Sequence, residues 1–147
     1  MIGAVLRSVG AVIVALMVAM ALIMGVEVLS AIVHPFPPGV DPSDLEVCKA
    51  HVARYPAWVL VAAMFAWGCT AFVSSWVATR LGAGRHWAHG IVVGLMLLAA
   101  VILNMSMLPY PSWFWTNVIV FPVCFIAGSK LAGRRTNQPP PDDDRME

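Results

Sequence analysis

One carboxylate, Glu27, lies well inside a long apolar stretch, and no other Asp, Glu, Lys or Arg of this chain does so. An ionisable side chain at membrane depth is costly, so it usually pairs with other groups or marks a functional site. Two amides, Asn104 and Asn117, lie inside later apolar stretches. Such groups can titrate, bind a cation or hold a ligand amine, provided that the elements carrying them bring them together.

Four apolar stretches cover residues 9–33, 57–79, 87–108 and 113–133. About 20 helical residues cross the apolar core of a bilayer, which is roughly 30 Å thick, and each stretch is long enough. The chain is 60% hydrophobic and 12% charged, whereas a soluble domain carries about twice that share of charge. The sequence therefore predicts an all-α, polytopic membrane protein, with one four-transmembrane-helix bundle over residues 1–135.

The basic residues favour one side of the predicted membrane. Four spans put both termini on the same side, and that side collects most of the basic residues: Arg7, Arg80, Arg85, Lys130, Arg134 and Arg135. The opposite side has Lys49 and Arg54, which acidic neighbours offset. The positive-inside rule then places both termini in the cytoplasm, and we expect a bacterial inner membrane. The net charge of +1 argues against a nucleic-acid partner.

The connections between the spans also have readable signals. Three prolines in residues 35–39 end the first helix. Asp41 and Pro42 suit an N-cap and a first helical position, so we expect a short external interfacial helix over residues 42–54. Residues 136–147 are acidic and proline-rich, and we expect them to form a disordered cytoplasmic tail.

Small residues recur along one face of several spans. They include the Gly90-x-x-x-Gly94 pair, and similar stripes follow on two other spans: Gly68, Ser75 and Thr79, and Asn117, Cys124, Gly128 and Ala132. Small faces let membrane helices approach closely, where no hydrophobic force drives them together. We therefore expect a compact bundle.

Helical geometry places the polar side chains near one end of that bundle. Glu27 lies about 9 Å inside the outer end of its span, and Asn104 and Asn117 lie about 6 Å inside theirs, at 1.5 Å per residue. His34 follows Glu27 by two helical turns and so shares its face. We predict that Glu27, Asn104, Asn117 and His34 form a small polar pocket open to the outer leaflet.

Such a pocket indicates a transporter-like protein, or one that binds a ligand or cation at Glu27. An alternative is that Glu27 and the two asparagines hydrogen-bond one another and fix helix register. Another is an accessory or assembly subunit, whose polar groups and small-residue faces dock into a larger membrane complex or a homo-oligomer. The lipid bilayer is the expected partner in every case.

An enzyme is a further alternative, because Glu27, His34 and His51 could act together in the membrane. It is disfavoured, since no nucleophile–base arrangement is visible. No cofactor is expected. No metal site is expected either, because the three cysteines form no Cys-x-x-Cys pair and the His86–His89 pair has no third ligand nearby.

Residues 25–39 followed by Asp41, together with Asn104 and residues 109–114, resemble an uncharacterised family of small bacterial four-helix integral membrane proteins. The resemblance covers nearly the whole chain and implies architecture only. The small multidrug resistance transporters also have four helices and a carboxylate in the first. Glu27 is off-centre, however, and the first external loop is far longer here, so they offer an analogy for mechanism and not a relationship.

Overall fold

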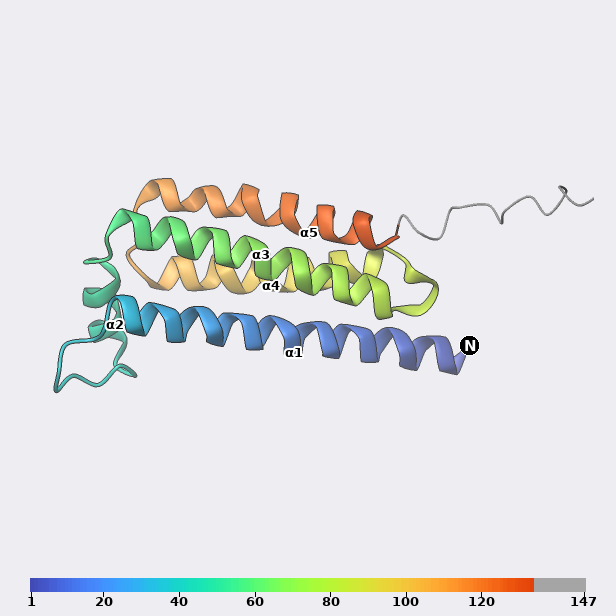
Figure 1. Cartoon of the computed structure of the whole chain (residues 1–147), viewed down its shortest axis with the longest axis horizontal. Coiled ribbons are helices and arrows are strands. Elements are labelled where there is room, and N and C mark those ends of the chain that lie inside the picture. The colour runs from blue at the N-terminus through green and yellow to red at the C-terminus, as the bar shows by residue number, and fades with distance from the viewer. Residues whose placement is uncertain (134–147) are drawn as a thin grey trace, which may run out of the picture.

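The computed structural model describes residues 1–133, and in that range the chain consists of helices and connecting turns. Four long helices run side by side: α1 (Ile2–Val33), α3 (Ala57–Leu81), α4 (Ala88–Met107) and α5 (Asn117–Gly133) (Figure 1). The prediction of an all-helical chain with four long apolar helices is confirmed for the described residues. The predicted tail over residues 136–147 lies outside them.

Short elements connect the long helices. A two-turn helix, α2 (Leu45–Val52), lies between α1 and α3. Two 3-10 turns, η1 (Ala83–Arg85) and η2 (Ser112–Thr116), precede α4 and α5. By length and composition, α1, α3, α4 and the η2–α5 segment are each able to cross a membrane. Large apolar side chains are exposed along them, as expected of a multi-pass membrane protein.

The two ends of the bundle differ in charge. The start of α1 and the close of α5 lie at one end, and α2 lies at the other (Figure 1). We term these the basic end and the α2 end, because the first carries four Lys and Arg side chains among residues 1–133: Arg7, Arg80, Arg85 and Lys130. Two hydrogen bonds fasten α1 at the basic end. Arg7 Nε donates to the Leu81 carbonyl at 2.9 Å, and His89 Nε2 lies 2.9 Å from Ser8 Oγ.

Small residues bring the helices together over the basic half of the bundle. The buried residues of α1 are Ala11, Ala15 and Ala19. A Cβ added at Gly90 would lie 2.5 Å from the Ser75 carbonyl oxygen, and one at Gly94 would overlap the Phe125 ring. Only glycine allows α4 to approach α3 and α5 this closely, so the close packing predicted for these glycines is confirmed.

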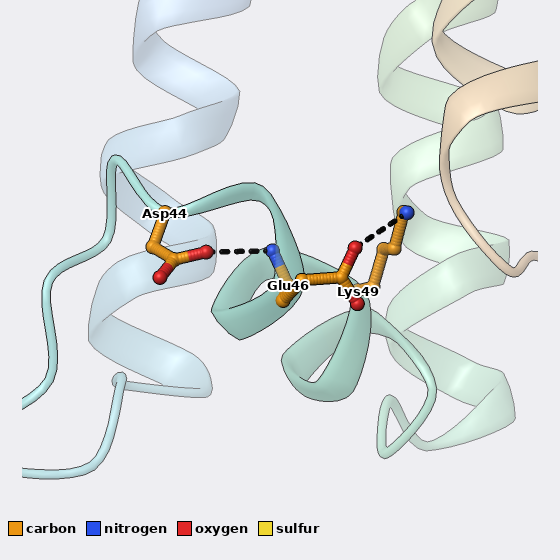
Figure 2. Close-up of polar contacts among 3 residues, drawn as sticks. All are labelled: Asp44, Glu46 and Lys49. Atoms are coloured by element: carbon orange, nitrogen blue, oxygen red, sulfur yellow. Dashed lines mark hydrogen bonds and ion pairs between the residues drawn. The ribbon is translucent and has the colours of Figure 1, made fainter.

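The external helix begins three residues later than predicted, because the aspartate expected to cap it makes a local turn instead. The Asp41 carboxylate accepts hydrogen bonds from the Ser43 backbone N–H at 2.9 Å and from its hydroxyl at 2.7 Å. Asp44 is the N-cap and accepts from the Glu46 backbone N–H at 2.8 Å. Glu46 also pairs with Lys49 at 2.8 Å, which supports the short helix (Figure 2).

Candidate functional site

Glu27 lines two neighbouring cavities in the half of the bundle nearest α2. The α2-end cavity has a volume of about 390 Å³ and lies mainly between α1, α2 and α3. The mid-bundle cavity has a volume of about 200 Å³ and is lined by α1, α3, α4 and α5. Glu27, Trp67 and Asn104 line both, so these three side chains mark the place where the cavities meet.

The cavities begin where the alanine stripe of α1 ends. At four-residue spacing, Ala11, Ala15 and Ala19 are followed by Ile23 and Glu27, in a row that turns by about 40° around the helix at each step. The three alanines are buried against the bundle, whereas no residue of α1 beyond Ala19 is buried. Ile23 and Glu27 have larger side chains than the alanines, and both line the mid-bundle cavity.

Asn104 is held by a tyrosine from the turn that follows α4. The Tyr110 hydroxyl donates to Asn104 Oδ1 at 3.2 Å. Burial, followed by the nearby charges of Glu27 and Tyr55, raises the pKa of Tyr110 well above its ordinary value. Tyr110 is therefore a protonated donor at neutral pH. The tyrosine hydroxyl bonds the amide oxygen of Asn104, and the Asn104 NH₂ group has no hydrogen-bond partner among residues 1–133.

Aromatic rings close the α2-end cavity at its α2 side. His51 is buried, stacks on Phe36 and on His34 at centroid distances of 3.9 Å and 4.7 Å, and has Nε2 3.1 Å from the His34 carbonyl oxygen. Burial, and then the charge of His34, lowers the pKa of His51, so its ring is mostly neutral at pH 7. The Tyr55 hydroxyl lies 3.0 Å from Ser30 Oγ and joins α1 to the start of α3.

The Glu27 carboxylate has neither a hydrogen bond nor an ion pair within the part of the chain that the structure describes. In the helix-register interpretation, Glu27 would hydrogen-bond the two asparagines. Those bonds are not formed among residues 1–133, where Asn104 bonds Tyr110 and Asn117 bonds the Phe114 carbonyl. The carboxylate is left exposed to the two cavities.

The structure brings two of the four predicted pocket residues to one cavity and leaves the others outside. Glu27 and Asn104 line both cavities. His34 lies behind the wall, where its ring packs against His51 and makes an edge contact with Tyr55 at 5.0 Å. Asn117 lines neither cavity.

Asn117 lies apart from Glu27 because of how the helices are arranged. It is the first residue of α5, and α5 packs mainly on α3 and α4, on the far side of the bundle from α1 (Figure 1). Its side chain is fully buried, and Nδ2 donates to the Phe114 carbonyl at 3.0 Å. The side-chain oxygen has no hydrogen-bond partner among the described residues. Equal depth along two helices therefore did not put Asn117 and Glu27 on facing surfaces.

Several residues at the cavity were not predicted as part of it. Tyr55, Trp67 and Tyr110 all line the α2-end cavity, and they come from the turn before α3, from α3 itself and from the turn after α4. The sequence did have one signal. The chain has two tyrosines, both next to prolines at the α2 end of the bundle, and Glu27 lies in that same half. Aromatic residues at the ends of membrane spans often anchor the interface, so this placement does not by itself indicate a cavity.

Among residues 1–133, no three His, Cys, Asp or Glu side chains are grouped in a way that could hold a metal ion. Both ring nitrogens of His89 are engaged, one with Ser8 and one with the His86 carbonyl at 2.8 Å.

Compared with known proteins, the chain matches no family model, no curated protein and no solved structure.

Proposed function

We propose that this chain is a multi-pass membrane protein that binds a positively charged ligand at Glu27, as a small transporter or ligand-binding protein. The observation that carries the proposal is the unpartnered Glu27 carboxylate at the meeting point of two cavities. A carboxylate in a poorly hydrated site is stable only with a counter-charge, hydrogen-bond donors or a proton. A ligand ammonium group supplies both the charge and the donors.

The charges around the cavities also favour a cation. No described Lys or Arg lines either cavity. The other titratable groups in the α2-end cavity are Cys48, His51, Tyr55 and Tyr110. Of these, His51 and Tyr110 are mostly neutral at pH 7, because burial lowers the pKa of the first and raises that of the second. Glu27 therefore sets the sign of the charge in the cavity, and an anionic ligand would find no opposite charge.

The cavity walls suit an organic cation better than a bare metal ion. Tyr55, Trp58, Trp67 and Tyr110 line the α2-end cavity. Aromatic faces attract cations by roughly 0.5–2 kcal/mol, most strongly where water is excluded. A bare divalent ion would instead need several oxygen ligands, and Glu27 is the one carboxylate of the described lining. An amine with an apolar body matches both the charge and the walls.

The orientation in the membrane follows from the basic end. Arg7, Arg80, Arg85 and Lys130 support a cytoplasmic location for the basic end, and α2 and the Glu27 cavities would then face the outside. The ligand would then enter from the outer face or from the outer leaflet. For a bacterial chain, this membrane would be the inner membrane.

Binding of benzylammonium to the purified full chain tests the proposal. We expect calorimetry at neutral pH to detect binding of benzylammonium to the wild type. Binding to Glu27→Gln should be weaker by about tenfold or more, because a charge-assisted interaction is lost. Glutamine keeps the size and most of the hydrogen-bonding capacity of the side chain. Glu46→Gln is the matched control, since it removes an exposed carboxylate on α2 outside both cavities and should leave binding unchanged.

Benzyl alcohol has the same ring as benzylammonium but no charge, so it separates the two contributions to binding in the same experiment. We expect it to bind weakly and equally to wild type and to Glu27→Gln. If benzylammonium binds the wild type and Glu27→Gln equally well, or binds neither, the proposal is refuted.

A second candidate function is docking into a larger membrane complex, and the exposure of α1 favours it. Of the 32 residues of α1, three are buried in this chain, and all three are alanines. A helix with so little cover offers faces on which another chain can pack. Purification in mild detergent distinguishes the two candidates, because a stoichiometric partner that survives Glu27→Gln would support docking and not ligand binding.

A further inference from the structure

The mid-bundle cavity is an apolar extension of the site at Glu27. Beyond the three shared residues its lining is almost entirely hydrocarbon: Ile23, Thr70, Leu97, Ala100, Val101 and Phe121. The one polar side chain of that set, Thr70, donates its hydroxyl to the Ala66 carbonyl of its own helix at 2.9 Å. The mid-bundle cavity therefore offers a ligand apolar contact, with polar partners only at Glu27 and Asn104.

The shape of the mid-bundle cavity suits a chain running along the bundle. Its lining on α4 extends from Asn104 to Leu97, about 10 Å at the helical rise of 1.5 Å per residue. On α1 it extends from Glu27 to Ile23, one helical turn. The polar groups thus lie at one end of an elongated apolar space, an arrangement that matches a molecule with a polar head and a tail.

The same cavities disfavour the common phospholipids as occupants. A phosphate group would come within the field of the Glu27 carboxylate, and no described Lys or Arg lines either cavity to balance it. A neutral alcohol or acylglycerol would leave the carboxylate without a counter-charge. The remaining class has a single ammonium group and an alkyl chain, with no anionic group.

We propose that the protein binds a single-chain alkylamine, with the ammonium group at Glu27 and Asn104 and the alkyl tail in the mid-bundle cavity. This inference rests on the proposed function and adds the class of ligand. Trp67 lies at the junction and lines both cavities, so its ring is placed to pack against the first methylenes of the tail. The aromatic α2-end cavity then serves as the vestibule through which the ligand enters.

The test is a ladder of primary amines, from butylamine through octylamine to dodecylamine, titrated onto the full chain in detergent. Each methylene that enters the cavity should raise affinity about fourfold until the cavity is full, from about 0.8 kcal/mol per buried CH₂. The neutral alcohol of each length is measured in parallel. Dividing the amine affinity by the alcohol affinity removes the partitioning of alkyl chains into detergent.

Filling the mid-bundle cavity with a larger side chain should remove the gain in affinity that a longer alkyl tail provides. For Ala100→Phe we expect the ratio of octylamine to butylamine affinity to fall about tenfold, because several methylenes lose their contacts. Ala99→Phe is the matched control on α4, since Ala99 is exposed and lines neither cavity, and its ratio should stay at the wild-type value. Ile23→Phe fills the cavity from the α1 wall and replaces Ala100→Phe if that variant does not fold. Leu22→Phe is its exposed control.

The results separate this inference from the proposed function. If benzylammonium binding depends on Glu27 but the octylamine-to-butylamine ratio is unchanged in both filling variants, the tail site is refuted and the proposed function stands. If no amine binding depends on Glu27, both fail. Lysophosphatidylethanolamine adds a third arm, because it carries the ammonium group together with a phosphate. Binding equal to that of dodecylamine would overturn the exclusion of phospholipids, and about tenfold weaker binding would support it.

Discussion

The two halves of this bundle are built from the same four helices and differ in how closely α1 approaches the others. In the basic half, Ala11, Ala15 and Ala19 are buried, and Gly90 and Gly94 admit α3 and α5 at near contact. In the α2 half, the next two positions of that four-residue series are Ile23 and Glu27, which line the cavities. The change from small to large side chains along this series thus coincides with the boundary between a packed region and a hollow one.

The side-chain hydrogen bonds that connect α1 to the other described elements lie toward its two ends. At the basic end, Arg7 bonds the last turn of α3 and Ser8 bonds His89 of α4. At the α2 end, the contacts are made through Ser30 and through the His34 carbonyl. Between these ends, no side chain of α1 beside the cavities makes a hydrogen bond to another described helix. No hydrophobic force drives membrane helices together, so side-chain packing decides how closely α1 approaches its neighbours there.

The largest expected effect comes from placing reporters at the two ends of the bundle, which we expect to lie on opposite sides of a membrane. A phosphatase reporter inserted within residues 41–44 should be active outside, and the same reporter fused after Gly133 should be inactive. A fluorescent reporter that folds only in the cytoplasm should give the reverse result. Activity of the phosphatase at both positions, or only after Gly133, would overturn the orientation and place Glu27 toward the cytoplasm.

The next effect contrasts two glycines, one from each half. Gly90→Ala should lower the free energy of unfolding by about 1–3 kcal/mol, because its Cβ would press on the Ser75 carbonyl and on the Thr79 hydroxyl. Gly25→Ala, on α1 beside the hollow half, meets nothing within 4 Å. It should be neutral or stabilising by up to about 1 kcal/mol, through helix propensity. Thermal unfolding in one detergent measures both.

The glycine pair also offers a direct way to break the comparison. Equal stability losses in the two variants would mean that the halves do not differ in packing, and a stable Gly90→Ala protein would contradict the close approach of α4 to α3.

The smallest effect is a pH dependence located at the α2 end. Burial, followed by the charge of His34 and with a further part from Arg54, lowers the pKa of His51 below its ordinary value of about 6.5. The unfolded chain then binds more protons than the folded chain just below that pH. The stability that His51 contributes is complete above about pH 6.5 and declines as the pH falls from there to the folded pKa.

Thermal unfolding between about pH 7.5 and about pH 5.5 should show this decline in the wild type. The slope should flatten in His51→Gln and persist in His86→Gln, which removes an exposed histidine at the basic end. An unchanged slope in His51→Gln would assign the pH dependence to another group.

Much of the fold followed from local properties of the chain. The length and composition of each apolar stretch predicted four long helices, since a helix satisfies its backbone hydrogen bonds within itself. The Gly90-x-x-x-Gly94 spacing predicted close packing, which the Phe125 ring against Gly94 confirms. The start of the external helix was less predictable, because Asp41 and Asp44 are both good caps and a local turn with Ser43 decided between them.

The site was only partly predictable, for a reason visible in two residues. Asn104 and Asn117 lie at similar depth, yet Asn104 faces the cavities and Asn117 is buried near the Phe114 carbonyl. Depth follows from sequence position and helical rise. Which helices face each other depends on the order of the bundle, and here α5 lies away from α1.

By itself, the sequence determined the helices, their small-residue faces and the position of Glu27 along its helix, because these depend on the local backbone and on residues close in the chain. Only the tertiary structure decided which groups surround that carboxylate. Tyr110, His51 and Trp67 reach the cavities from segments far apart in the sequence. Their meeting depends on the separation between α1 and its neighbours, and that separation is set by side-chain volumes on several helices at once.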